Sequence, residues 1–258
     1  MDRTYVVTGA ASGIGAATAR YLREHGGSVI ACDLHDADVI ADLATREGRA
    51  HLVDAVSRLS RGNLDAIVAN AGGGPPETML SLNFFGALAT LEGLRPLLEP
   101  SPAPRAVMVS SIASLSPPDP RILEACLNMD EPAAIAAAKD ALAAGKGPLD
   151  LYGNAKYALN CWCRRVASKP DWAGAGIALN VVAPGFIDTP AAAYILSDPD
   201  RRAQAGRMVP MRGAFPGRPD QMAAVLAWCV STENSLMTGQ ILFVDGGAEC
   251  SMRGERSW

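Results

Sequence analysis

Val6-Val7-Thr8-Gly9-Ala10-Ala11-Ser12-Gly13-Ile14-Gly15 is the stretch that decides the fold. It begins as a buried strand, passes through a glycine turn and continues as a helix. Gly9 permits a tight turn, Gly13 lets the backbone approach a phosphate, and Gly15 lets the helix pack on the strand. The N-terminus of a helix presents free N–H groups and favours an anion such as pyrophosphate. Taken alone, the stretch is equally compatible with an ordinary strand-to-helix turn.

Length and composition favour one large α/β domain over residues 1–258. The chain has 258 residues, of which 49% are hydrophobic and 19% charged, which is typical of a globular protein. It contains no apolar run of about 18 residues, the length that a membrane span requires. Met1-Asp2-Arg3 leads straight into the first predicted strand, so we expect no targeting peptide and a cytoplasmic protein. A net charge of −4 gives no basic patch for nucleic acid.

The cysteines do not form a metal-binding pattern. All six are scattered without a C-x-x-C pair: Cys32, Cys126, Cys161, Cys163, Cys229 and Cys250. We expect reduced, mostly buried thiols and no metal site.

Short β-branched runs alternate with helical patterns along the chain. The predicted strands are 4–8, 28–32, 38–42, 65–69, 105–110, 177–182 and 240–244. The predicted helices lie near 13–26, 44–60, 77–99, 150–168 and 218–231. This alternation predicts a doubly wound Rossmann-type fold with a parallel sheet of about seven strands and helices on both faces.

Two segments interrupt the alternation. Residues 113–149 hold a proline cluster followed by an alanine-rich helix near 132–144, and residues 187–217 are rich in Pro, Ala, Met and Arg. Both follow predicted strand ends, where ligands bind in open α/β sheets. We therefore predict a helical insertion in the first segment and a substrate lid in the second.

Asp33 ends the second predicted strand. In dinucleotide-binding folds, a carboxylate that binds the ribose hydroxyls of adenosine follows the glycine turn by roughly 20 residues. The separation between Gly15 and Asp33 in the sequence is close to this value. The same charge would repel a 2′-phosphate, and no Arg or Lys lies between Thr8 and Gly15 to offset it. The sequence therefore favours NAD over NADP. An aspartate that only caps the next turn is the alternative.

Tyr152 and Lys156 are four residues apart on one predicted helix, so their side chains share a face. A phenol titrates near 10, too high for a base at neutral pH. A neighbouring ammonium together with a positively charged nicotinamide ring favours the phenolate and makes it a usable acid/base group. A surface pair without a role is the alternative.

Further polar residues follow the strand ends. Ser110 and Ser111 close the fifth predicted strand, where a hydroxyl can bind a substrate carbonyl oxygen. Asn83 is a polar residue inside an apolar helix and could equally be a helix-bending amide. The small residues of 70–73 let the chain pass close to a cofactor, and 183–190 leaves the sixth strand where a nicotinamide would lie. Each of these is also compatible with ordinary turn chemistry.

Taken together and in this order, the motifs resemble the classical short-chain dehydrogenases/reductases over essentially the whole chain. The matching pieces are Thr8-Gly9 with Gly13-Ile14-Gly15, Asp33, Asn70-Ala71-Gly72, Asn83, Ser111, Tyr152 with Lys156, Pro184-Gly185 with Thr189, Thr238-Gly239-Gln240 and Asp245-Gly246-Gly247. Within the family, residues 32–43, the adjoining Glu47-Gly48-Arg49 and the long insertion resemble the bacterial NAD-dependent 3α-hydroxysteroid dehydrogenase/carbonyl reductase group.

The resemblance implies a role for each matching residue. Tyr152 would be the general acid/base, and Lys156 would hold the nicotinamide ribose and lower the tyrosine pKa. Ser111, the second serine of its pair, would orient the substrate oxygen, and Asn83 would hold a water that links Lys156 to solvent. The implied NAD-binding residues are Gly9, Ser12, Gly13, Ile14, Gly15, Asp33, Asp42, Leu43, Asn70, Ala71, Gly72, Tyr152, Lys156, Pro184, Gly185, Ile187 and Thr189, with Asp42 and Leu43 at the adenine ring.

One departure from the family concerns assembly. The separation between Ser111 and Tyr152 is longer than the family commonly shows, because the insertion lies between them. It should cover the helices through which these enzymes associate, so we expect a homodimer that uses another surface or a homotetramer with an altered interface.

The predicted activity is an NAD-dependent hydride transfer between a secondary alcohol and a ketone or aldehyde on an apolar, cyclic substrate of the 3α-hydroxysteroid or carbonyl type. Apolar residues of the lid support it: Tyr194, Ile195, Leu196, Met208, Val209, Met211 and Phe215. A lid that packs on the core is the alternative reading. The other candidate functions are an aryl or coniferyl-type alcohol dehydrogenase, a non-catalytic NAD-sensing protein on the same fold, and a nucleotide-sugar epimerase or dehydratase, whose usual glycine spacing and longer C-terminal domain this chain does not show.

Overall fold

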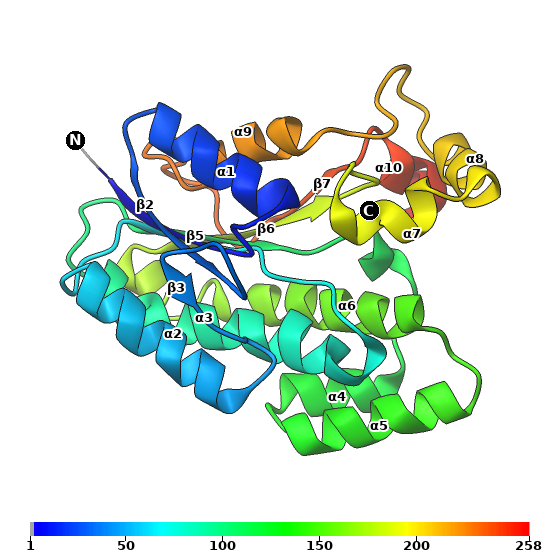
Figure 1. Cartoon of the computed structure of the whole chain (residues 1–258), viewed down its shortest axis with the longest axis horizontal. Helices are drawn as coiled ribbons and strands as arrows, with labels where there is room; N and C mark the ends of the chain where they lie inside the picture. Colours follow the sequence, from blue (N-terminus) through cyan, green and yellow to red (C-terminus); the bar gives the residue numbers. More distant parts are fainter. Residues whose placement is uncertain (1–2, 258) are drawn as a thin grey trace.

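The computed structural model describes residues 3–257 and is built around one parallel sheet (Figure 1). The strands are β1 Thr4–Thr8, β2 Ser28–Asp33, β3 Val39–Ile40, β4 Ala66–Ala69, β5 Arg105–Val109, β6 Ala178–Pro184 and β7 Ile241–Val244. They lie in the order β3-β2-β1-β4-β5-β6-β7, and every neighbouring pair is parallel. The predicted fold class is confirmed, and β3 is shorter than predicted.

Helices cover both faces of the sheet. The α-helices are α1 Gly13–Glu24, α2 Arg46–Leu59, α3 Ala87–Leu94, α4 Pro120–Leu127, α5 Glu131–Ala143, α6 Pro148–Val166, α7 Ala193–Leu196, α8 Pro199–Arg207, α9 Pro219–Cys229 and α10 Ala248–Arg253. Figure 1 shows α1 and α9 on one face and α2, α3 and α6 on the other. Each face has its own apolar core. Strands buried on both sides explain the continuous apolar runs that predicted them.

The order of the strands reverses between β1 and β4. The chain leaves β1 toward β2 and β3 on one side, and later returns to β4 and β5 on the other side. Such a reversal leaves a crevice beyond the carboxyl ends of the strands, and ligands bind there in open sheets. The turn after β1 and the segments after β4, β5 and β6 all meet at this edge.

The predicted helix over 77–99 is interrupted. It consists of the 3-10 turn η1 Pro76–Thr78, the π-helix η2 Ser81–Gly86, α3, and the 3-10 turn η3 Arg95–Leu98. Pro96 accounts for the end of the regular helix, because proline cannot donate the next backbone hydrogen bond. The π-helix carries Asn83, and a widened turn of this kind is frequent at functional sites.

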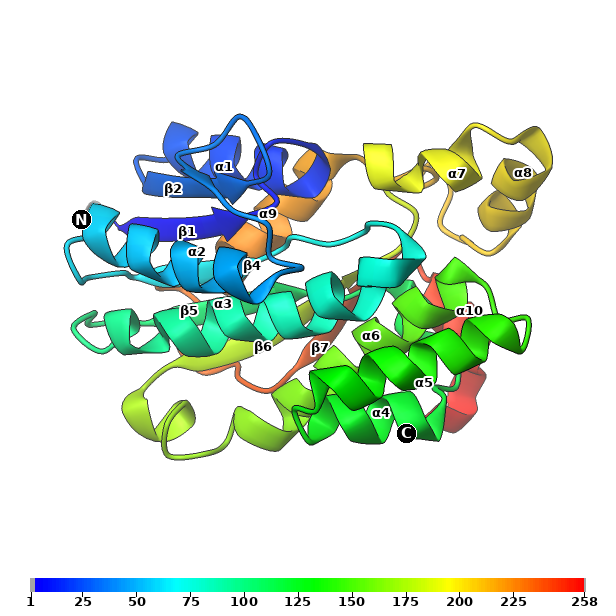
Figure 2. The same ribbon diagram turned by 60° about the horizontal axis from the view of Figure 1, so that its bottom comes forward.

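The insertion is a pair of helices, α4 and α5, that lies beyond α6 (Figures 1 and 2). Pro120, one of the prolines of the cluster, opens α4. Asp119 caps that helix by accepting from the N–H of Arg121 at 2.9 Å; proline suits the first turn because its missing N–H would have no partner there. Ile122 is fully buried in the core shared with α6, so the insertion packs on its own subunit.

No helix within residues 3–257 is long and apolar enough to cross a membrane. Over the same residues, no group of three or more His, Cys, Asp or Glu side chains is placed to hold a metal ion.

Candidate active site

The glycine turn between β1 and α1 has the geometry that its residues predict. Gly9 and Gly13 have φ values of +68° and +52°, in the left-handed region where glycine carries no steric penalty. A Cβ on Gly15 would lie 1.9 Å from the carbonyl oxygen of Gly9. The first turn of α1 can therefore approach β1 this closely only because residue 15 is glycine.

The N-terminus of α1 offers polar groups for a phosphate. Ser12 is the N-cap residue, yet its hydroxyl makes no capping hydrogen bond to the helix, and the first turn holds no acidic residue. Thr189 approaches from the segment after β6: a Cβ on Gly13 would lie 3.1 Å from its methyl group. These groups fit a pyrophosphate, which needs hydrogen-bond donors and a turn without side-chain bulk.

Thr8, which carried no predicted role, fastens this turn to the segment after β4. Its Oγ1 accepts from the N–H groups of Asn70 and Ala71, both at 3.0 Å. The amide Nδ2 of Asn70 returns a hydrogen bond to the carbonyl of Thr8 at 3.0 Å. A threonine that ends a buried strand beside a glycine turn is the signal that could have indicated this role.

Asp33 lies at the carboxyl end of β2 and faces the same turn. Its Oδ2 accepts from the N–H of Ala11 at 2.8 Å, and its Oδ1 from the N–H of Leu34 at 2.6 Å. The carboxylate therefore lies next to the groups that would bind a dinucleotide, with its negative charge fixed by two backbone donors.

Asp42 and Leu43 form a turn after β3. Asp42 is exposed, and its Oδ1 accepts from the N–H of Ala44 at 2.9 Å. Leu43 is buried and packs on the π-helix, because a Cβ on Gly86 would lie 3.1 Å from the Leu43 Cβ.

Ser111, Tyr152 and Lys156 come together at the end of β5. The Nζ of Lys156 lies 5.4 Å from the ring centroid of Tyr152 and donates to the carbonyl of Val109 at 2.9 Å. The Ser111 hydroxyl makes a side-chain hydrogen bond to Tyr152. Gly153 permits the contact between the two segments, since a Cβ there would lie 2.8 Å from the carbonyl oxygen of Ala113.

The two serines after β5 have different surroundings. Ser110 is buried, and its hydroxyl donates to the carbonyl of Lys156 at 3.2 Å. The Ser111 oxygen accepts from the N–H of Ala113 at 3.1 Å, which leaves its hydrogen available to Tyr152. The geometry therefore places Ser111, the serine chosen from the sequence, beside the phenol.

The electrostatics of the pair differ from the sequence expectation. Burial raises the pKa of Tyr152, and the hydrogen bond from Ser111 opposes this increase only in part. Burial also lowers the pKa of Lys156 to about 7. We expected Lys156 to lower the tyrosine pKa, but the protein groups alone do not do so. The expectation also required a positively charged nicotinamide ring.

Asn83 uses its side chain to hold the loop after β4. Its Oδ1 accepts from the N–H of Gly73 at 3.0 Å, and its Nδ2 donates to the carbonyls of Gly73 at 2.8 Å and Met79 at 2.9 Å. Both amide hydrogens are used, so a water held by this side chain would bind Oδ1. A Cβ on Gly72 would lie 2.8 Å from that oxygen and 3.3 Å from the Lys156 Nζ. Gly72 therefore lies between Asn83 and Lys156.

The segment after β6 borders the crevice. Gly185 donates to the carbonyl of Val244 at 3.1 Å, and a Cβ there would lie 2.7 Å from the Asp245 Cβ. Ile187 forms a β-bridge with Gly217, which closes residues 187–217 into one excursion. Figure 2 shows its helices α7 and α8 beyond the carboxyl ends of the strands.

Ile187 at the base of this excursion joins the core, but the larger apolar side chains farther along it are at most partly buried. None of the seven that the sequence singled out is buried. Tyr194 is 59% exposed and Met211 is 66% exposed. The excursion therefore keeps apolar surface at Tyr194 and Met211, while the other five side chains are partly buried.

Comparison with known proteins identifies relatives over the whole chain. Residues 3–121 match the family model described as short chain dehydrogenase, and residues 127–249 match the model described as enoyl-(acyl carrier protein) reductase. The chain is 35% identical over 254 residues to 3-alpha-hydroxysteroid dehydrogenase/carbonyl reductase of Comamonas testosteroni, covering 96% of this chain and 97% of that protein.

Two further relatives are similar over nearly their full length. The cis-4-hydroxycyclohexanecarboxylate dehydrogenase of Sinomonas cyclohexanicum is 32% identical, with 95% of this chain and 96% of that protein covered. The crystal structure of the 3-alpha-hydroxysteroid dehydrogenase from Pseudomonas sp. B-0831 complexed with NADH superimposes with a TM-score of 0.89 at 37% identity. That comparison covers 98% of this chain and 99% of the other.

Proposed function

Because the chain belongs to the short-chain dehydrogenase/reductase family, we propose that it interconverts a secondary alcohol and a ketone with NAD as the hydride carrier. The observation that carries this proposal is the meeting of Ser111, Tyr152 and Lys156 at the end of β5. The phenol contacts the serine hydroxyl, and the Lys156 Nζ lies 5.4 Å from its ring.

The protein groups have separate tasks in this reaction. When bound, NAD supplies the hydride acceptor. Tyr152 takes the proton from the alcohol hydroxyl in oxidation and returns it to the carbonyl oxygen in reduction. With substrate bound, Ser111 would turn its one hydroxyl hydrogen from Tyr152 to the same substrate oxygen and stabilise the charge that develops there. Lys156 would hold the nicotinamide ribose, and its positive charge would favour the phenolate.

The dinucleotide would lie across the carboxyl edge of the sheet. Ser12 and the N-terminus of α1 would bind the pyrophosphate, and Asp42 and Leu43 would flank the adenine. The residues proposed to contact it are Gly9, Ser12, Gly13, Ile14, Gly15, Asp33, Asp42, Leu43, Asn70, Ala71, Gly72, Tyr152, Lys156, Pro184, Gly185, Ile187 and Thr189. Two observations support the fit: the close packing of α1 on β1 that Gly15 permits, and the uncapped hydroxyl of Ser12.

NAD is proposed over NADP because of Asp33. Its carboxylate lies at the end of β2, where it can accept hydrogen bonds from ribose hydroxyls. A 2′-phosphate at this position would face a negative charge already bound to two backbone N–H groups.

The proposed substrate is apolar and cyclic. The exposed Tyr194 and Met211 of the excursion offer adaptable apolar contacts. Two relatives are named for a hydroxysteroid and for a hydroxycyclohexanecarboxylate. An aryl or coniferyl-type alcohol is the alternative. A purely NAD-sensing protein would have no use for the Ser111–Tyr152 contact.

A substrate panel tests this proposal. A 3α-hydroxysteroid, a simple cyclic alcohol and an aryl alcohol are each supplied with NAD⁺ or NADP⁺, and NAD(P)H formation is followed by absorbance. We expect turnover of the steroid or the cyclic alcohol with NAD⁺. Turnover of the aryl alcohol alone would favour the coniferyl-type activity, and NADH binding without turnover of any of the three would favour the sensor.

A further inference from the structure

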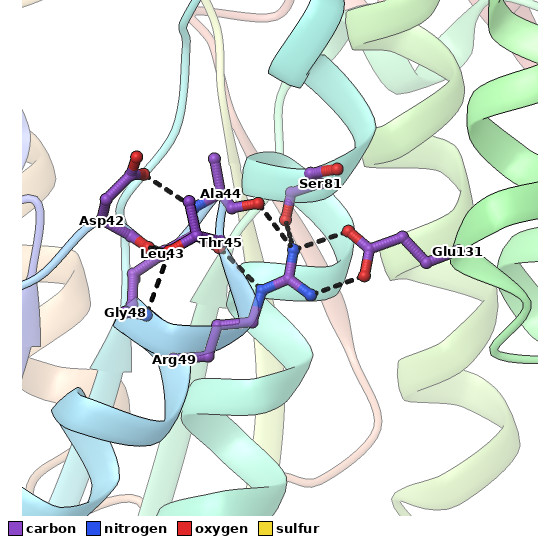
Figure 3. A network of polar contacts seen from close by, with 8 residues as sticks. All are labelled: Asp42, Leu43, Ala44, Thr45, Gly48, Arg49, Ser81 and Glu131. Atoms are coloured by element: carbon purple, nitrogen blue, oxygen red, sulfur yellow. Dashed lines mark hydrogen bonds and ion pairs between the residues drawn. The ribbon is translucent and has the colours of Figure 1, made fainter.

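Arg49 joins three segments that are distant in the sequence (Figure 3). Its Nε donates to the carbonyl of Leu43 at 2.7 Å, and its Nη2 donates to the carbonyl of Ser81 at 2.6 Å. Its Nη1 and Nη2 also bind the two carboxylate oxygens of Glu131, both at 2.7 Å. One guanidinium therefore connects the turn after β3, the π-helix and the first residue of α5 in the insertion.

The Arg49–Glu131 pair is largely withdrawn from solvent. The two side chains are 10% and 14% exposed. Burial acts to raise the pKa of Glu131, but its hydrogen bonds to Arg49 and Ser81 outweigh this and leave the pKa below its usual value. Glu131 also lies in the first turn of α5, where the helix dipole favours a negative charge. These contacts keep the Glu131 carboxylate ionised beside the guanidinium of Arg49.

The turn that Arg49 holds is the one that would receive the adenine. Within it, the carbonyl of Asp42 accepts from the N–H of Thr45 at 3.1 Å, and the Thr45 hydroxyl accepts from the N–H of Gly48 at 3.0 Å. These bonds join the turn to the start of α2, and the buried side chain of Leu43 packs on the π-helix. The backbone carbonyls of Leu43 and Ala44 are bound by Arg49, at 2.7 and 3.4 Å.

We propose that Arg49 and Glu131 are positioning residues for the adenosine half of the cofactor, so that the insertion sets the affinity for NAD. This inference rests on the proposed function. The planar guanidinium of Arg49 binds backbone carbonyls and the carboxylate of Glu131 at the same time. Loss of that carboxylate would leave a largely buried positive charge without its partner. Without Glu131, the guanidinium is no longer held between the turn and the insertion. The turn must then be ordered when the cofactor binds.

The test distinguishes effects on the adenosine half of the dinucleotide from effects on the nicotinamide half. Glu131→Gln keeps the size of the side chain and removes its charge, and Arg49→Lys keeps the charge and removes the fork. For each variant, the Kd of NADH and of ADP-ribose is measured by titration, and turnover is measured with NAD and with nicotinamide mononucleotide, which lacks the adenosine. Asp140→Asn is the matched control, because it breaks the exposed ion pair with Arg121 in the same insertion.

We expect Glu131→Gln to raise the Kd of NADH and ADP-ribose by about tenfold, the cost of ordering a turn on binding. kcat with saturating NAD and turnover with the mononucleotide should stay within about twofold of the wild type, as should all values for Asp140→Asn. If Arg49→Lys does not fold, as judged by circular dichroism, Glu131→Gln still decides the result.

Two results would overturn the inference alone: unchanged ADP-ribose affinity in Glu131→Gln, or an equal loss of turnover with NAD and with the mononucleotide, which would indicate a general structural role. Failure of the wild-type protein to bind either NADH or ADP-ribose would instead overturn the proposed cofactor site.

Discussion

The ammonium group of Lys156 donates a hydrogen bond to the carbonyl of Val109 at 2.9 Å, which ties the middle of α6 to the end of β5. This contact brings the serine that follows β5 and the tyrosine one turn earlier on α6 to the same place. Lys156 is 2% exposed, and burial lowers its pKa to about 7. One side chain therefore combines a structural contact with an ammonium group whose charge burial opposes.

The buried lysine predicts a pH-dependent stability. In the unfolded chain its pKa is near 10.5, against about 7 in the folded protein. Between these values the unfolded state binds more protons, so this group makes the free energy of unfolding rise with pH from about 7 toward 10. Urea unfolding without cofactor should show this rise for the wild type relative to Lys156→Met. A difference between the two proteins that stays constant with pH would contradict it.

Gly15→Ala should disrupt the cofactor turn. The new Cβ would lie 1.9 Å from the Gly9 carbonyl oxygen, so α1 must move away from β1. We expect a loss of stability of about 1–3 kcal/mol, typical of overpacking, and a large loss of NADH affinity. Gly174→Ala is the control, because its Cβ would meet nothing closer than 3.5 Å. Thermal unfolding and NADH titration of both variants check the prediction, and equal effects would contradict it.

Asp33→Ala should narrow the preference between NAD and NADP. The change removes an acceptor for the ribose hydroxyls and a charge that opposes the 2′-phosphate. We expect the difference in kcat/KM between the two cofactors to shrink mainly because kcat/KM with NAD falls. Steady-state kinetics with both cofactors provide the measurement. If the wild-type enzyme uses NADP as efficiently as NAD, the assignment of Asp33 to the ribose is wrong.

The insertion should determine how the chain assembles. Helix α4 packs on α6, and Ile122 is buried in the core that α3 and α6 share. We therefore expect a homodimer formed through another surface, or a tetramer with an altered interface. Light scattering gives the mass, and a crystal structure gives the interface. Burial of α3 and α6 against their own symmetry mates would refute the expectation.

Local sequence patterns predicted the parts of the site that depend on local geometry. Tyr152 and Lys156 share a helix face because they are four residues apart. The glycines near α1 all belong to the single turn that joins β1 to α1. Arg49 and Glu131 are 82 positions apart, and no periodicity relates them. Their contact depends on the packing of the insertion, which local patterns do not specify.

Other features of the structure depend on contacts that local patterns do not specify. Pro120 opens α4 in the first turn, directly after the cap that Asp119 forms. The hydrogen bonds of Asn83 to Gly73 and Met79 depend on how the π-helix and the loop after β4 pack together, and they leave Oδ1 as the atom that would bind the expected water. The sequence shows that residues 187–217 contain apolar side chains. Which of them are exposed, such as Tyr194 and Met211, depends on the tertiary fold.

The central claim is that Tyr152 is the acid/base group of an NAD-dependent enzyme. Its most direct test is turnover of Tyr152→Phe with the best substrate of the panel, together with NADH affinity, with Tyr157→Phe on the same helix as the control. We predict that Tyr152→Phe loses about 10²–10⁴-fold in kcat, typical for removal of a general acid/base, while its NADH affinity stays within a few-fold and Tyr157→Phe behaves like the wild type. Retention of most of the activity by Tyr152→Phe would contradict the account.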